Sequence, residues 1–289
     1  MNTIGQAIVN GIMIGGIYAM VGMSLNLIFG VMKIVNFCQG EILMISMYMS
    51  YVLNEKVGLD PFLSIPLVAI MMFCVGALLQ MFLITRSMRE EDDSNVLFLT
   101  CCLSIFFANL ALLIFKSDYR TAKSVFENKV VHLGTMNISS PKLLSFVILM
   151  VVTALIFLML KYTTLGKQIR AASQNPRGAE VTGIKAKSIY AITYGLGAAI
   201  AGIAGSCLMS FYYVFPTVGN IYGTRSFIVV TLGGLGSVLG AFFGGIVLGL
   251  LETLGAVVVG SSFKDALVFF IFILILIGKA EFNQKKQRG

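Results

Sequence analysis

Long stretches without a single charged residue constrain this chain more than any other feature. Such stretches occur at Met1–Met32, Pro61–Thr85, Ser94–Phe115, Leu143–Leu160, Ser188–Thr224 and Ser226–Leu251. An α-helix needs roughly 20 apolar residues to cross a bilayer, so several of them are long enough to do so. Charged residues make up only 12% of the chain, whereas a soluble domain carries about 25%. The composition therefore excludes an ordinary soluble domain.

The apolar residues follow one another in continuous runs and do not alternate with polar ones. Only helices and closed barrels satisfy the backbone within lipid, and barrel strands would show alternation. We therefore predict an all-α fold, a polytopic transmembrane helix bundle that forms one domain over residues 1–289. Helices are expected at about Gln6–Phe29, Asn36–Leu53, Phe62–Ile84, Val96–Phe115, Leu143–Tyr162, Ser188–Phe211, Ser226–Val259 and Asp265–Ile277.

The excess positive charge of the chain, +8 in total, is confined to two segments. Residues 161–187 hold six Lys or Arg against one Glu, a net charge of +5, and residues 279–289 hold four against one, a net charge of +3. Positive charge beside membrane helices marks the cytoplasmic side. We therefore expect a cytoplasmic loop at about 163–187 and a cytoplasmic C-terminus. The helix order then places the N-terminus and the long polar loop Lys116–Pro141 outside.

The apolar segment Ser226–Val259 is too short for two full crossings and a turn, yet the last helix must return to the cytoplasm. We therefore expect eight or nine crossings, some of them broken or re-entrant. Glycines release the chain from helical geometry, and Leu232–Gly240 is rich in them. Because glycine-interrupted apolar segments point to the substrate region of transporters, the expected pathway includes Gly233, Gly234 and Gly236. The alternative is that these glycines only let helices pack closely.

Small residues also recur at four-residue spacing along the apolar runs, a pattern that lets helix backbones approach one another in lipid. We interpret them as sites of close helix packing. They are Gly197, Ala201 and Gly205, then Gly240 with Gly244, and Gly245 with Gly249.

Charged residues inside the apolar runs are few, and such residues are usually functional because a buried charge is costly. Glu41 ends the string Asn36–Glu41, in which Asn36, Gln39 and Gly40 are also polar or conformationally permissive. This string is either part of the wall of a substrate pathway or a helix cap, with Asn36 as the capping residue. Glu252 is either a substrate contact or the partner of a polar group on a neighbouring helix.

Other chemistries receive little support from the sequence. The five cysteines all lie in apolar runs without a CxxC pair, and His132 is the only histidine. We therefore expect no metal site, and an intramembrane enzyme would need a cluster of reactive groups that the sequence does not offer. We expect no nucleic-acid binding, since the basic residues flank membrane segments. No GxxxxGK[ST] motif occurs, so no ATP site is expected in this chain.

The cytoplasmic loop contains Asn175-Pro176, which sets a turn or a helix start between two short helices. It resembles the cytoplasmic loop of the LivH-type permeases of branched-chain amino acid ABC importers. That loop typically reads G-R-x-x-R-A, two or three residues, N-P, A-A and finally G-I. The matching residues are Gly166, Lys167, Arg170, Ala171, Asn175, Pro176, Ala179, Gly183 and Ile184.

Further motifs match the family in the right order along nearly the whole chain. Val35–Glu41 resembles its N-F-A-H-G-E, although Gln39 stands in place of the usual His and Cys38 in place of a small residue. Val230–Ala241 resembles its V-L-G-G-I-G-S-x-x-G-A. The remaining matches are Gly244-Gly245 with Gly249 and Glu252, Tyr212–Pro216, and Lys264-Asp265.

The resemblance implies a permease subunit in the bacterial cytoplasmic membrane that moves branched-chain amino acids by alternating access. It implies four partners: a second, related permease subunit, two ATPase subunits that bind the ATP, and an extracytoplasmic substrate-binding protein. The cytoplasmic loop would be the coupling helix that docks on the ATPase. The docking residues would be Lys167, Arg170, Asn175, Pro176, Arg177, Ala179, Glu180 and Gly183.

Alternatives stay open at this point. Permeases of this type also carry urea, short amides or other amino acids, and a passive channel would share most of the sequence features. The basic loop has a simpler interpretation as an anchor on lipid head groups. A homodimer in place of a pair of related permeases is a further alternative.

Overall fold

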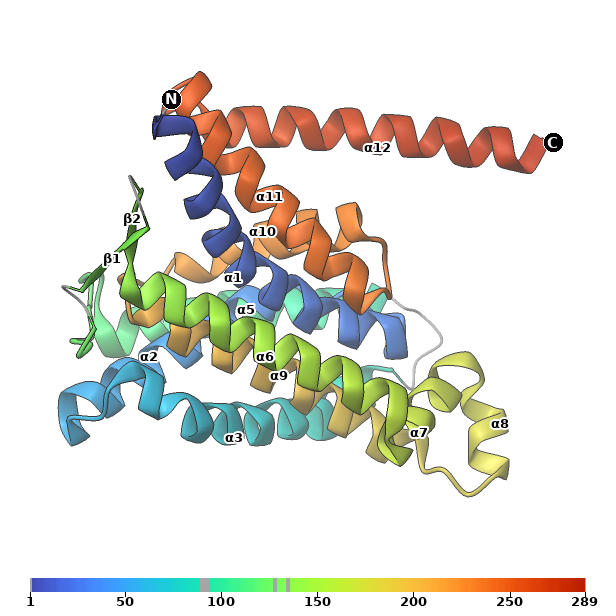
Figure 1. Cartoon of the computed structure of the whole chain (residues 1–289). Coiled ribbons are helices and arrows are strands. Elements are labelled where there is room, and N and C mark those ends of the chain that lie inside the picture. Colours follow the sequence, from blue (N-terminus) through green and yellow to red (C-terminus); the bar gives the residue numbers. More distant parts are fainter. Residues whose placement is uncertain (1, 89–93, 127–128, 134–135, 289) are drawn as a thin grey trace.

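The computed structural model describes residues 2–88, 94–126, 129–133 and 136–288 (Figure 1). Long helices dominate it, as the apolar runs predicted. They are α1 (Asn2–Met32), α2 (Gln39–Val57), α3 (Pro61–Leu79), α5 (Ser94–Phe115), α6 (Ser140–Tyr162), α9 (Ala186–Met209), α10 (Val218–Gly233), α11 (Val238–Val258) and α12 (Lys264–Arg288). Helix α3 continues through a π-helical turn, η1 (Gln80–Ile84), into α4 (Thr85–Ser87).

Six helical segments of the described chain are long and apolar enough to cross a membrane. They are Ile4–Met32, Pro61–Ser87, Ser94–Phe115, Ser140–Tyr162, Ala186–Met209 and Val238–Val258. The first and fifth form the centre of the bundle, because 83% and 78% of their most apolar stretches are buried. Only 11% of the most apolar stretch of α5 is buried, so α5 is a peripheral helix.

Small residues bring the central helices together, as their spacing predicted. On α9, a Cβ added to Gly197 would meet Ile28 of α1, and one added to Gly205 would meet Ser46 of α2. On α11, Gly245 and Gly249 leave room for the backbone of α1, which crosses at Ala19 and Gly15. Close approaches of this kind hold α1 between α9 and α11 (Figure 1).

The expected helix Ser226–Val259 is broken at the predicted glycines. Helix α10 ends at Gly233, and Gly234 and Gly236 have φ angles of 91° and 84°, which other residues rarely adopt. The start of α10 differs from the prediction, which ended one helix at Phe211, began the next at Ser226 and so left the residues between them as a loop. The helix begins at Val218 because the glycines that suggest a loop there, Gly219 and Gly223, let α2 approach at Gly40.

The all-α prediction is wrong for one segment of the long polar loop. Strands β1 (Val130–Leu133) and β2 (Met136–Ser139) pair antiparallel, with Val130 opposite Ser139 and Leu133 opposite Met136. The β-branched residues at the start of β1 favour a strand. A hydrogen bond from Gln6 Nε2 to the Asn137 carbonyl oxygen, 2.7 Å long, ties this hairpin to the first turns of α1.

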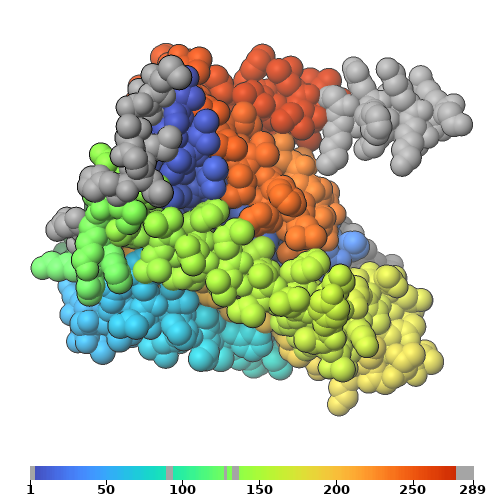
Figure 2. All heavy atoms as spheres, in the orientation of Figure 1, coloured from blue at the N-terminus to red at the C-terminus, as the bar shows by residue number. Residues whose placement is uncertain are grey.

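The basic loop forms two short helices on either side of Asn175, as predicted. Helix α7 (Thr164–Gln174) is capped by the Thr163 hydroxyl, and α8 (Pro176–Val181) by the Asn175 side chain, which accepts a hydrogen bond from Gly178 N at 2.9 Å. The α7–α8 pair (yellow) protrudes at one end of the molecule (Figure 2). The β1–β2 hairpin lies at the opposite end, and α12 points its C-terminal end toward the side of α7 and α8 (Figure 1).

Candidate functional site

The polar string before α2 folds into a buried network. Asn36 and Gln39 are fully buried. Asn36 Nδ2 donates to Gln39 Oε1 at 3.0 Å, and Gln39 Nε2 donates to Ser24 Oγ of α1 at 2.7 Å. The alternative in which Asn36 caps the helix is wrong, and so is the expected helix start at Asn36. Helix α2 starts at Gln39 with Cys38 as its N-cap, because the Asn36 side chain instead accepts from Cys38 N.

Gly40 is the point where α2 crosses α10. A Cβ on Gly40 would overlap the carbonyl oxygen of Gly219 and come within 2.8 Å of Gly223 Cα. The crossing therefore requires glycine at Gly40, and it places the next residue, Glu41, against α10.

Glu41 is 2% exposed, and its Oε1 atom is buried without a hydrogen-bond partner among the described residues. The carboxylate lies against Gly219, where an added Cβ would be 3.0 Å from both Glu41 Cδ and Oε1. Glu41 also lines a cavity of about 630 Å³ between α2, α5, α10 and α12, together with Ser104 of α5 and Asn220 of α10. We name this space the Glu41 cavity. An acid at such a place can receive a cationic group.

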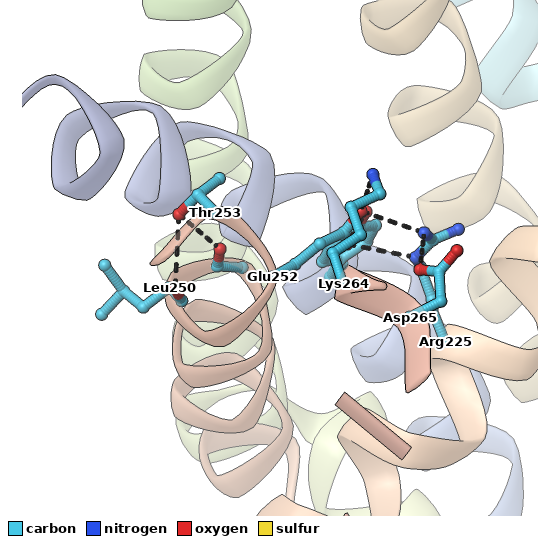
Figure 3. A network of polar contacts seen from close by, with 8 residues as sticks. Arg225, Leu250, Glu252, Thr253, Lys264 and Asp265 are labelled. Carbon is cyan, nitrogen blue, oxygen red and sulfur yellow. Dashed lines mark hydrogen bonds and ion pairs between the residues drawn. The ribbon is translucent and has the colours of Figure 1, made fainter. Parts of the chain in front are cut away.

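Glu252 of α11 lies in the opposite environment, a cluster of ion pairs (Figure 3). Its Oε1 accepts from Arg225 Nη2 at 3.0 Å and from Lys264 Nζ at 2.8 Å, and its Oε2 accepts from the Tyr18 hydroxyl at 2.6 Å. Arg225 also pairs with Asp265 at 3.2 Å. The guanidinium lies over the Tyr18 ring, 5.3 Å from its centroid.

This charged cluster joins four helices, since its members come from α1, α10, α11 and the start of α12. Two acids balance two bases, so the cluster is formally neutral. Glu252 is therefore the partner of polar groups on neighbouring helices, which was one of the two interpretations of this residue. It also lines a smaller cavity of about 270 Å³, which shares Asn220 and Thr224 with the Glu41 cavity.

The break between α10 and α11 is held by a residue that sequence reasoning missed, Asn26 of α1. Its Nδ2 donates to the carbonyl oxygens of Gly234 at 3.0 Å and Ser237 at 2.6 Å, and its Oδ1 accepts from Gly236 N at 2.6 Å. Asn26 is fully buried. The only signal for it was an amide inside the first charge-free stretch.

The glycine break and the two acids, which the sequence assigned to one pathway, lie in different cavities. Gly236 lines a cavity of about 450 Å³ together with Asn26 and with Lys161, Arg170 and Ser173 at the basic end. Gly233 faces α11, where a Cβ would overlap Gly240. The break therefore adjoins the α7 helix, whereas Glu41 and Glu252 line the cavities along α10.

The α7–α8 pair presents a basic surface, because Lys167, Arg170 and Arg177 are exposed. Arg170 also donates a hydrogen bond to the Leu160 carbonyl oxygen at the end of α6. The remaining predicted docking residues shape the pair. Ala179 is buried, Gly183 has a φ of 85° where α8 ends, Asn175 and Pro176 form the turn, and Glu180 is exposed.

These features define a class of protein, a multi-pass helical membrane protein with cavities along one inner helix and a basic helical pair at one end. A family model described as "branched-chain amino acid transport system / permease component" matches residues 7–276. The chain belongs to this family, and it is therefore a transport protein of the inner membrane rather than an enzyme.

Individual relatives agree with the family assignment. The chain is 30% identical to the high-affinity branched-chain amino acid transport system permease protein BraD of Pseudomonas aeruginosa, over 94% of this chain and 92% of the relative. It is 28% identical to LivH of Escherichia coli over the same shares. The ribose import permease protein RbsC of Bacillus subtilis matches over only 43% of this chain, at 29% identity. No solved structure matches.

Proposed function

We propose that this chain is a permease subunit of an ABC importer that carries branched-chain amino acids by alternating access, driven by separate ATPase subunits. The observation that carries this proposal is the exposed basic pair α7–α8, which adjoins the α10–α11 break across a shared cavity. An ATPase that pushes on this pair would act on the break through the ends of α1 and α6. The match of the family along almost the whole chain supports the substrate class.

The proposed topology has nine crossings. To the six apolar spans it adds α2, the 16-residue α10 and the first part of α12. An odd number of crossings places the N-terminus outside and the C-terminus in the cytoplasm with α7 and α8. The arrangement in Figure 1 supports this, because the hairpin and α7–α8 lie at opposite ends.

In the proposed pathway, substrate passes along the exposed face of α10, where Asn220 and Thr224 border both cavities. Glu41 and Glu252 line this route. The start of α2 is held in place by Asn36, Gln39 and Gly40, which support this route without lining its cavities. Gly233, Gly234 and Gly236 form the break that changes shape as the bundle opens to either side.

The proposed assembly contains this chain, a second related permease subunit, two ATPase subunits and an extracytoplasmic binding protein. The test is uptake of labelled leucine, isoleucine and valine into proteoliposomes that hold the assembly and internal ATP. We expect uptake to stop when the ATPase subunits carry a substitution that blocks hydrolysis. Uptake that continues without hydrolysis would identify a passive channel, and transport of urea or a short amide in place of leucine would overturn the substrate class.

A separate test addresses the docking surface. Charge reversal at Arg170 and Arg177 should abolish co-purification of the ATPase subunits, because their basic groups are exposed on the proposed interface. Lys123→Glu in the Lys116–Pro141 loop serves as the matched control, since it changes charge at the other end of the molecule. Co-purification that survives the double reversal would contradict this role for α7–α8.

A further inference from the structure

The Glu41 carboxylate is buried and incompletely satisfied. Only 2% of the Glu41 surface is exposed, and the Oε1 atom has no hydrogen-bond partner among the described residues. A buried carboxylate without a partner is costly, and in native structures such a group calls for a specific explanation.

No cation in the described part of the chain pairs with this carboxylate. None of the residues that line the Glu41 cavity is a lysine or an arginine. Arg225, on the same helix as the cavity residues of α10, already pairs with Glu252 and Asp265. The positive end of α2 favours a negative charge at Glu41, and the carboxylate interacts with the Glu41 backbone amide and with Ser104. Its Oε1 atom, however, lies against Gly219 without a hydrogen-bond partner among the described residues.

The rest of the cavity suits a small molecule with an apolar part. Its volume of about 630 Å³ falls in the usual range of ligand pockets. Aromatic and aliphatic side chains dominate its walls, among them Phe37, Ile105, Phe227 and Phe272. The polar groups are few, and Asn220 can donate a hydrogen bond to a ligand carboxylate.

We propose that the Glu41 cavity is a binding station for the substrate in transit, in which Glu41 binds the ammonium group of the amino acid. The apolar walls take the aliphatic side chain, and Asn220 faces the carboxylate. This inference rests on the proposed function and adds to it a selectivity: the station admits α-amino acids and disfavours acids of the same shape without an amine.

Cys101 offers a direct probe, because this native cysteine lines the same cavity. The exposed Cys74 and Cys102 are replaced by serine in the assembled importer in lipid nanodiscs. The reaction of Cys101 with neutral methyl methanethiosulfonate, which forms a mixed methyl disulfide and releases methanesulfinate, is then followed. We expect millimolar leucine to slow the labelling at least fivefold, and 4-methylpentanoate, which lacks only the amine, to leave the rate unchanged. In the Glu41→Gln variant, leucine should no longer protect.

Glu55→Gln is the matched control, since Glu55 is an exposed acid on the same helix. Leucine should protect Cys101 in this variant as in the native chain. Equal protection by 4-methylpentanoate, or protection by leucine that persists in Glu41→Gln, would overturn the proposal.

A second measurement does not depend on Cys101. Uptake of leucine by Glu41→Gln should fall at least tenfold while ATP hydrolysis stimulated by the binding protein persists, and Glu41→Asp should retain a third or more of the native uptake. Equal loss in both variants would overturn the ammonium-binding role. Native assemblies that take up no leucine would instead overturn the proposed function itself, so the two failures are distinguishable.

Discussion

The Glu41 cavity and the charged cluster around Glu252 border the same helix, α10, yet they treat a buried acid in opposite ways. Glu252 receives hydrogen bonds from three different side chains, and its charge is balanced within the protein. Glu41 Oε1 receives none from the described residues, and the Glu41 residue lines a cavity. The comparison teaches that a charge inside an apolar run can either join helices together or be held ready for a ligand, and that only its neighbours distinguish the two roles.

The largest effect is expected for Glu252→Gln, because it leaves Arg225 and Lys264 without their shared partner. Breaking a buried ion pair by removing one member costs about 3–5 kcal/mol. The variant should purify in low yield and unfold at a markedly lower temperature in detergent, as a thermal-shift measurement will show. If Glu252→Gln were as stable as the native chain, the claim that Glu252 holds the helices together would be wrong.

An intermediate effect is expected for Gly219→Ala, which changes the other region. The new Cβ would lie 3.0 Å from the Glu41 carboxylate and 3.1 Å from Glu41 N, so the crossing of α2 and α10 must widen. Inserting a methyl group into a tight contact costs about 1–3 kcal/mol. Thermal unfolding measures this cost. Gly58→Ala is a useful contrast, because Gly58 has a φ of 72° but no atom within 4 Å of an added Cβ. That variant therefore tests backbone strain without a close contact. If Gly219→Ala were as stable as the native chain, the close contact at Glu41 would be in doubt.

Glu41→Gln should shift stability in the opposite direction from Glu252→Gln. Replacing an incompletely satisfied carboxylate by a neutral amide removes a desolvation cost, so we expect a gain on the order of 1 kcal/mol together with the loss of uptake described above. The paired measurement is the unfolding temperature of both glutamine variants in the same detergent. A loss of stability as large as that of Glu252→Gln would show that Glu41 is also a structural acid.

The smallest effect is expected for Asp265→Asn, the outermost member of the charged cluster. Its side chain is 62% exposed and contacts only Arg225 among the ion pairs found in the described chain. Exposed ion pairs contribute about 0–1 kcal/mol, so the unfolding temperature should hardly change. A large loss would mean that Asp265, rather than Glu252, balances Arg225.

The local features of this fold were predictable from the sequence, because they depend on residues that are close together in the chain. Continuous apolar runs predicted the long helices, and glycines predicted the break after Gly233. Asn175-Pro176 predicted the turn between α7 and α8. The predictions were wrong where a contact between residues far apart in the chain determined the local structure. The glycines at the start of α10 suggested a loop, but they serve the crossing with α2.

What the sequence by itself determined was the class of fold and which few polar residues lie in the membrane, since the absence of charge and the position of glycine act locally. The tertiary structure alone decided what those polar residues do. Tyr18 lies 234 residues from Glu252, and Asn26 lies 210 from Gly236, yet each pair is hydrogen-bonded. Whether a buried carboxylate is paired or open depends on such distances in space. No pattern along the chain states them, because they are set by how closely the helices pack.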